Sequence, residues 1–180
     1  MSTPFLVTGF GPFLDHTINP SAVIAEQLSV PSHILPVSFA AVEAFLEQLE
    51  QDPPARLLML GVHGRAVKFH LERQARNRVG SAADIDGVAK SAGPIDPSGP
   101  PQLRGTLWPK GFRTMLGEPK LTNSLDAGTY LCNYAYYRAI QRLPSTRVGF
   151  LHIPRFEAIS HDDQLPIVQK IVGMVHGAAV

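Results

Sequence analysis

The 180-residue sequence predicts an α/β fold built on a mostly parallel β-sheet. Over the first 62 residues, three short apolar runs alternate with two helical patterns, in the order strand, helix, strand, helix, strand. Neighbouring parallel strands need such crossover helices. Hydrophobic residues make up 44% of the chain and charged residues 17%, which is a globular composition. We therefore expect one domain over residues 1–180 with a sizeable core.

The first half of the chain is expected to supply three buried strands and two helices. In chain order these are a strand at 4–10, a helix at 22–28, a strand at 33–37, a helix at 38–51 and a strand at 56–62. Asn19 or Ser21 can cap the first helix, with Pro20 near its first turn. The stretch Asp52-Pro53-Pro54 ends the second helix, because the residue before a proline is disfavoured in helical conformation.

The second half is expected to be less regular before it returns to alternating elements. We predict an extended segment at 66–78, loops and short strands at 80–106, a short helix at 108–116, a strand at 120–124, a helix at 128–143, a strand at 147–153 and a helix at 164–175. In the first of these, Val67, Phe69 and Leu71 alternate with polar residues, which is the period of a strand. Asp126 is a possible cap for the helix at 128–143.

Charge and targeting features argue against several classes of protein. The chain has 16 Lys and Arg residues against 15 Asp and Glu residues, so its net charge of +1 predicts no nucleic-acid partner and no attraction to an acidic membrane. No apolar run approaches the roughly 20 residues that span a bilayer. The first residues lack the pattern of a signal peptide. With a single cysteine, these features predict a cytoplasmic protein.

Two glycine-containing turns indicate where chemistry is expected. The segments GFGPF at 9–13 and GVHGR at 61–65 lie at the carboxyl ends of the first and third predicted strands. In parallel sheets, ligands bind at the carboxyl ends of the strands. The two turns therefore predict a ligand site at one edge of the sheet.

The single cysteine, Cys132, lies in the segment SLDAGTYLCN at 124–133 and cannot form an internal disulfide. It is either a small buried hydrophobic residue or a reactive thiol. His152 lies near the end of a predicted strand, and Glu72 follows the GVHGR turn. A cysteine, a histidine and an acid on three separate elements fit a nucleophile, a base and a residue that orients the base. Spacing alone leaves both interpretations open.

Five motifs together resemble the pyroglutamyl peptidase I family of cysteine peptidases. They are VTGFGPF with NPS at 7–21, LGVHGR at 60–65, LERQARN at 71–77, SLDAGTYLCN at 124–133 and FLHIP at 150–154. The resemblance implies hydrolysis, through a thioester, of the amide bond that follows an N-terminal pyroglutamyl residue of a small peptide. It also implies a three-layer α/β/α sandwich with a mostly parallel, twisted mixed sheet (phosphorylase/hydrolase-like), a homotetramer, and no cofactor or metal.

The resemblance also implies roles for individual residues. By position, the nucleophile is Cys132, the base is His152 and its acidic partner is Glu72. Phe10 and Phe13 match residues that line the substrate pocket of the family, although both could also be core residues.

The sequence departs from the family in one segment. Where the family commonly has D-A-R-I-P-D-N, Ala82 and Ala83 replace the Arg-Ile pair, in a segment that lies beside the substrate in the family. This difference threatens the level of activity or the choice of substrate, and it leaves the fold unaffected.

Three alternatives remain on the residues alone. His63, His70 and Glu72, with His161, Asp162 or Asp163, could hold a metal, although their spacing matches no helical metal motif. The chain could also hydrolyse another small amide. The altered 80–86 segment further allows a non-catalytic protein that binds pyroglutamyl-like ligands.

Overall fold

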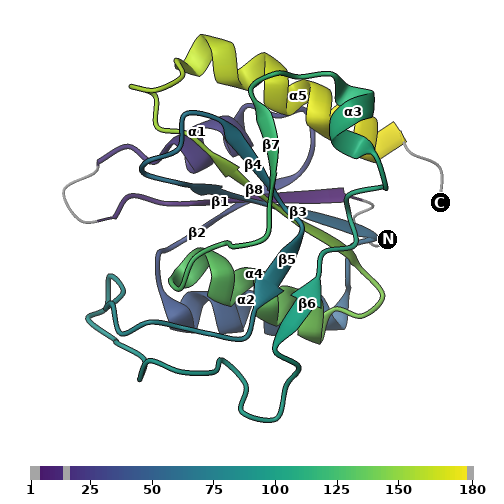
Figure 1. The fold of residues 1–180 in the computed structure, drawn as a ribbon. Helices are drawn as coiled ribbons and strands as arrows, with labels where there is room; N and C mark the ends of the chain where they lie inside the picture. Colours follow the sequence, from purple (N-terminus) through teal and green to yellow (C-terminus); the bar gives the residue numbers. More distant parts are fainter. Residues whose placement is uncertain (1–4, 14–16, 178–180) are drawn as a thin grey trace.

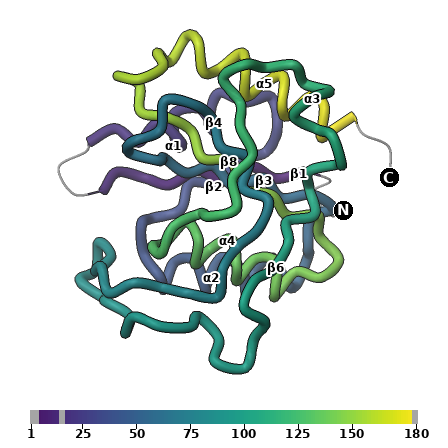
Figure 2. Tube along the Cα trace, viewed as in Figure 1, coloured from purple at the N-terminus to yellow at the C-terminus, as the bar shows by residue number. Residues whose placement is uncertain are grey.

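The computed structural model describes residues 5–13 and 17–177 and arranges them in three layers (Figure 1). The strands are β1 (Phe5–Phe10), β2 (Ser32–Leu35), β3 (Arg56–Val62), β4 (Phe69–Glu72), β5 (Gln74–Arg76), β6 (Gln102–Arg104), β7 (Leu121–Ser124) and β8 (Arg147–Ile153). The helices are α1 (Pro20–Glu26), α2 (Phe39–Gln51), α3 (Phe112–Leu116), α4 (Leu131–Arg142) and α5 (His161–Gly177). Figures 1 and 2 show α1, α3 and α5 on one face of the main sheet and α2 and α4 on the other.

The main sheet is mixed but mostly parallel, which confirms the predicted fold class. Its strand order is β2-β1-β3-β8-β4-β7, and all neighbours are parallel except β4 and β8. The antiparallel register places His70 opposite His152 and Glu72 opposite Phe150. Strands β5 and β6 form a separate antiparallel pair. The sheet therefore brings residues 72 and 152, which are far apart in sequence, onto neighbouring strands.

Several element boundaries differ from those expected. The expected helix at 108–116 begins only at Phe112, because Gly111 precedes it in a left-handed conformation (φ 76°). The helix expected from residue 128 begins at Leu131, after Gly128 (φ 87°) and an extended Tyr130. The extended segment at 66–78 is confirmed as β4 and β5. Helix α5 starts at His161, earlier than expected.

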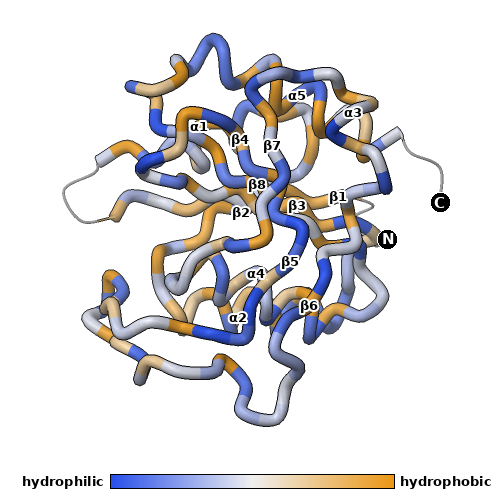
Figure 3. Tube along the Cα trace, in the orientation of Figure 1, coloured by the Kyte–Doolittle hydropathy of each residue, from blue (hydrophilic) through white to orange (hydrophobic). Residues whose placement is uncertain are grey.

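The core consists of two hydrophobic clusters, one on each face of the sheet. Along β3, Leu58 and Leu60 belong to one cluster, while Leu57 and Met59 belong to the other. All four are fully buried, as expected for a strand covered on both faces. Figure 3 shows the hydrophobic positions concentrated along the central strands. Within the described residues, no helix is both long and apolar enough to cross a bilayer.

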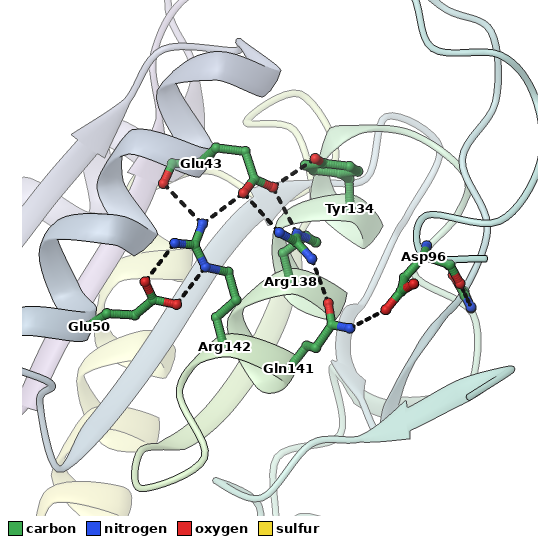
Figure 4. A network of polar contacts seen from close by, with 8 residues as sticks. Glu43, Glu50, Asp96, Tyr134, Arg138, Gln141 and Arg142 are labelled. Carbon is green, nitrogen blue, oxygen red and sulfur yellow. Dashed lines mark hydrogen bonds and ion pairs between the residues drawn. The ribbon is translucent and has the colours of Figure 1, made fainter. Parts of the chain in front are cut away.

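A network of ion pairs joins α2 to α4, the helix that carries Cys132 (Figure 4). The Glu43 carboxylate accepts hydrogen bonds from Arg138 Nε at 2.8 Å, Arg142 Nη1 at 2.7 Å and the Tyr134 hydroxyl at 2.7 Å. Arg142 also donates two hydrogen bonds to the Glu50 carboxylate. Burial alone would raise the pKa of Glu43, but the hydrogen bonds and positive charges of these partners lower it overall. Glu43 is therefore held ionised as the centre of this helix pair.

Substitution of Glu43 by glutamine is expected to lower the free energy of unfolding by about 1–2 kcal/mol near pH 7, because half-buried Arg138 loses its charge partner. The folded pKa is lowered, so this stabilisation is present above the ordinary carboxyl pKa and is lost as pH falls through the folded value. Urea denaturation of both forms at about pH 7 and about pH 3 measures the effect. The matched variant Glu47→Gln, at an exposed position of α2, should change stability by less than about 0.5 kcal/mol. Equal losses in the two variants would contradict the prediction.

Candidate active site

A cavity of about 340 Å³ lies at the carboxyl ends of β1 and β3 and beside the N-terminus of α4. Both glycine-containing turns contribute to it, through Phe10 and Phe13 from the first and Gly64 from the second. The complete lining is Phe10, Phe13, Ile18, Asn19, Pro20, Val37, Val62, Gly64, Tyr130, Leu131, Cys132, Arg155, Phe156 and Glu157. The lining is mostly apolar and aromatic, which suits a small, flat, uncharged ligand group.

Cys132 is the second residue of α4 and is half-buried in the wall of this cavity. The N-cap residue Tyr130 gives no side-chain hydrogen bond to the helix start. The first-turn N–H groups of a helix and its dipole favour a thiolate over a thiol. Asp126 is not the helix cap, because its carboxylate instead binds Arg78 at 2.8 Å and Arg76 at 3.3 Å. Cys132 is thus nearer the positive helix end than an Asp126 cap would place it.

Strand β3 approaches the thiol closely at Gly61. A Cβ atom at this position would lie 2.8 Å from Cys132 Sγ and 2.7 Å from Phe150 Cζ. Both distances are shorter than real Cβ contacts, so any side chain here would displace the sulfur or the ring. A glycine at residue 61 therefore lets the thiol pack directly against the central sheet.

His152 and Glu72 form a buried pair across the antiparallel strands β8 and β4. His152 Nδ1 lies 2.8 Å from Glu72 Oε1, and the two residues are 3% and 0% exposed. The backbone carbonyl of Glu72 accepts hydrogen bonds from Trp108 Nε1 at 3.2 Å and from the Tyr136 hydroxyl at 2.9 Å. These bonds fix the end of β4 and with it the position of the carboxylate.

The imidazole of His152 lies between the thiol and the carboxylate. Burial would lower the pKa of His152, but hydrogen bonding to the side chains of Cys132 and Glu72, and their negative charges, raise it to about 9. The Phe150 ring, at 4.8 Å between centroids, and the perpendicular His63 ring, at 5.7 Å, pack against it. The imidazole can therefore hold a proton taken from the thiol, with Glu72 stabilising the cation.

The structure brings together the residues that the sequence singled out, and it places both predicted phenylalanines in the cavity wall. Phe10 lines the cavity and is also a core residue, since it is 3% exposed and belongs to a hydrophobic cluster. Phe13 is half-buried, with its ring centroid 5.7 Å from that of Tyr130.

Sequence reasoning missed several lining residues, among them Tyr130, Asn19 and Val37. Asn19 was expected only as a helix cap, and it does accept from Ser21 N at 3.1 Å. Its amide also donates to the Gly11 carbonyl at 2.9 Å, which shapes the loop around Phe10 and Phe13. Tyr130 could have been expected in the cavity wall, because it lies two residues before Cys132 in the sequence.

The altered segment at 80–86 contacts two residues of the cavity wall. The Tyr130 hydroxyl donates to the Ala83 carbonyl at 2.8 Å, and Ile85 N donates to the Val37 carbonyl at 3.1 Å. Tyr130 and Val37 both line the cavity, so this segment supports its wall. A cationic side chain reaches the cavity from elsewhere, since Arg155, after β8, is part of the lining.

Of the histidines considered as metal ligands, two lie close to each other. The rings of His63 and His70 lie 5.2 Å apart between centroids. However, within residues 5–13 and 17–177, no group of three or more His, Cys, Asp or Glu side chains is arranged to hold a metal ion. His161 instead contacts Gln27 and Asp162, each at 2.9 Å.

Comparison with known proteins gives consistent results for sequence and fold. A sequence model of the family described as pyroglutamyl peptidase matches residues 3–179. The chain is 34% identical over 172 residues to pyrrolidone-carboxylate peptidase of Halalkalibacterium halodurans, covering 86% of this chain and 85% of that protein. It is 29% identical over 174 residues to human pyroglutamyl-peptidase 1, covering 89% of this chain and 83% of that protein. The crystal structure of pyrrolidone carboxyl peptidase from Thermus thermophilus is similar with a TM-score of 0.79 and 32% identity, covering 92% of this chain and 97% of that one.

Proposed function

This chain belongs to the pyroglutamyl peptidase family, and from that membership we propose that it is a cysteine peptidase that removes the N-terminal pyroglutamyl residue of small peptides. The observation that supports this function most directly is the thiol of Cys132 at the start of α4. It lines a mostly apolar cavity and interacts with a buried His–Glu pair. A thiol, an imidazole and a carboxylate in this order form a nucleophile, its base and the residue that orients the base.

The reaction follows from the order of these three groups. His152 takes the proton of Cys132, and the thiolate attacks the carbonyl carbon of the pyroglutamyl residue. The protonated imidazole then gives its proton to the departing amine, which leaves a thioester on Cys132. His152 next takes a proton from water, whose oxygen displaces the sulfur and releases pyroglutamate. Glu72 holds the imidazole in place and stabilises its charge in each step.

The cavity supplies the remaining interactions. Backbone N–H groups in the first turn of a helix have no partner within the helix, so those of α4 can stabilise the negative oxygen that forms during the attack. The rings of Phe10, Phe13 and Tyr130 provide flat apolar surfaces for a lactam ring. A lactam is uncharged and planar at its amide, so it fits this lining better than a free amino acid would.

The assembly and location of the protein are part of the same proposal. A catalytic thiol must stay reduced, which favours the cytoplasm. The resemblance to the family supports a single peptidase domain and a homotetramer. Sedimentation analysis of the purified protein tests the tetramer.

The function is tested by amine release from a panel of aminoacyl amides under reducing conditions. We expect turnover of the pyroglutamyl amide at least about 10²-fold above that of prolyl and glutaminyl amides, because these lack the lactam or its carbonyl. Iodoacetamide should abolish the activity and a chelator should leave it unchanged. Preferred turnover of another amide, loss of activity to the chelator, or binding without turnover would contradict the proposal.

A further inference from the structure

A second cavity, of about 660 Å³, lies away from the first and shares no lining residue with it. Figure 1 shows the elements that carry its lining, β5, β6, β7 and α3, on the near side of the molecule. The lining comprises Arg73, Gln74, Gln102, Arg104, Lys110, Gly111, Arg113, Thr114, Asn123 and Leu125. Four of these side chains are cationic and none is acidic, so the cavity is strongly basic.

The positive charge of this cavity is local and uncompensated. The whole chain has a net charge of only +1, so the clustering is not a result of a generally basic protein. Among the residues that the structure describes, none of the four cationic side chains forms an ion pair with a carboxylate. Burial lowers the pKa of Arg73, and the positive charge of Arg104 lowers it further. Such mutual repulsion is relieved when an anion binds.

Several of the polar side chains are held in position by the backbone. Arg113 Nε donates to the Leu121 carbonyl at 2.7 Å, and Gln74 Nε2 donates to the Leu125 carbonyl at 3.0 Å. Arg73 Nη2 donates more weakly to the Trp108 carbonyl at 3.4 Å. Each guanidinium keeps further N–H groups for a ligand. Planar guanidinium groups match the oxygen pairs of phosphate, and their positioning lowers the entropy cost of binding.

We propose that this cavity binds a small anion that carries several linked phosphate groups. Because the cationic and polar lining side chains come from several separate segments, a chain of two or three phosphates can contact more of them than a single phosphate can. The cavity volume is in the range of small-molecule sites. Inorganic triphosphate and a nucleoside triphosphate share this chemistry. The proposal is independent of the peptidase function.

The test is calorimetric titration of the full-length protein with inorganic triphosphate, ATP, orthophosphate and citrate at low and at moderate salt. We expect triphosphate to bind at least about tenfold more tightly than orthophosphate or citrate. Its binding should weaken at the higher salt concentration, because salt screens the charges. Tighter binding of ATP than of triphosphate would identify a nucleotide as the ligand, and equal binding would identify the phosphate chain alone.

Variants locate the site. Arg104→Gln and Arg113→Gln should each weaken triphosphate binding by about fivefold or more, and the double variant further. Arg147→Gln, at an exposed arginine that starts β8 outside the cavity, should change it by less than about twofold. Circular dichroism checks the fold of each variant, and Lys110→Gln, an exposed position, replaces any variant that does not fold.

Three outcomes would overturn the proposal. The first is the absence of triphosphate binding at millimolar concentration. The second is equal weakening by Arg147→Gln, which would show general attraction to surface charge. The third is that the wild type does not bind triphosphate and that Arg104→Gln loses an assembly of subunits that the wild type forms. That result would make the cavity a contact between copies of the chain.

Discussion

Replacement of Cys132 by alanine is expected to lower kcat/KM for a pyroglutamyl amide by at least about 10⁴-fold, because removal of the nucleophile of a catalytic triad leaves only binding and oxyanion stabilisation. The thiol at the start of α4 has no second thiol to replace it, since Cys132 is the only cysteine of the chain. Amine release under reducing conditions measures the loss. The variant should still bind a pyroglutamyl peptide, because the aromatic lining of the cavity is unchanged.

The serine variant of the same residue separates chemistry from shape. Cys132→Ser keeps a side chain of similar size at the start of α4 but replaces a thiol with an alcohol, which ionises far less readily. We expect less than about 1% of wild-type activity, with a thermal unfolding midpoint close to that of the wild type. Activity of the alanine variant above about 1% of wild type would show that the thiol is not the nucleophile.

The fold was predictable because its signals are local. The apolar run at 56–62 has the length and composition of a buried strand, and β3 is found there with both faces covered. The turns at 9–13 and 61–65 both line the cavity beside Cys132, as expected because the carboxyl ends of parallel strands meet at one edge of a sheet. These expectations need only the order of elements along the chain.

The details of the site depend on contacts that sequence order does not contain. The hydrogen bond between His152 and Glu72 requires β4 to lie antiparallel to β8, within a sheet that is otherwise parallel. The start of α4 at Leu131 depends on the backbone conformation of Gly128 and Tyr130, whereas the residue types alone pointed to Asp126 as the cap. The basic cavity was invisible because its cations come from segments spread over residues 73–113, within a chain of near-neutral charge.

Substitution of Glu72 by glutamine is expected to lower kcat by between about 10²- and 10⁴-fold, less than removal of His152. The carboxylate can only accept a hydrogen bond from His152 Nδ1, whereas an amide can also donate one to that nitrogen and so favour the wrong tautomer. KM should change little, because Glu72 does not line the cavity. Steady-state kinetics on the pyroglutamyl amide measures both parameters, and Glu47→Gln on α2 is the control for the same chemical change.

The pH dependence distinguishes this positioning role from a merely structural one. The pKa of His152 is raised to about 9, so the imidazolium that protonates the leaving amine persists to that pH, and wild-type activity should fall above it. The same shift stabilises the folded protein fully below the ordinary histidine pKa, and this stabilisation is lost as pH rises through about 9. Removal of the Glu72 charge lowers the pKa of His152, so the alkaline limb of the kcat profile should move to lower pH in Glu72→Gln. An unchanged alkaline limb, with kcat reduced only in proportion to unfolded protein, would show that Glu72 acts through stability alone.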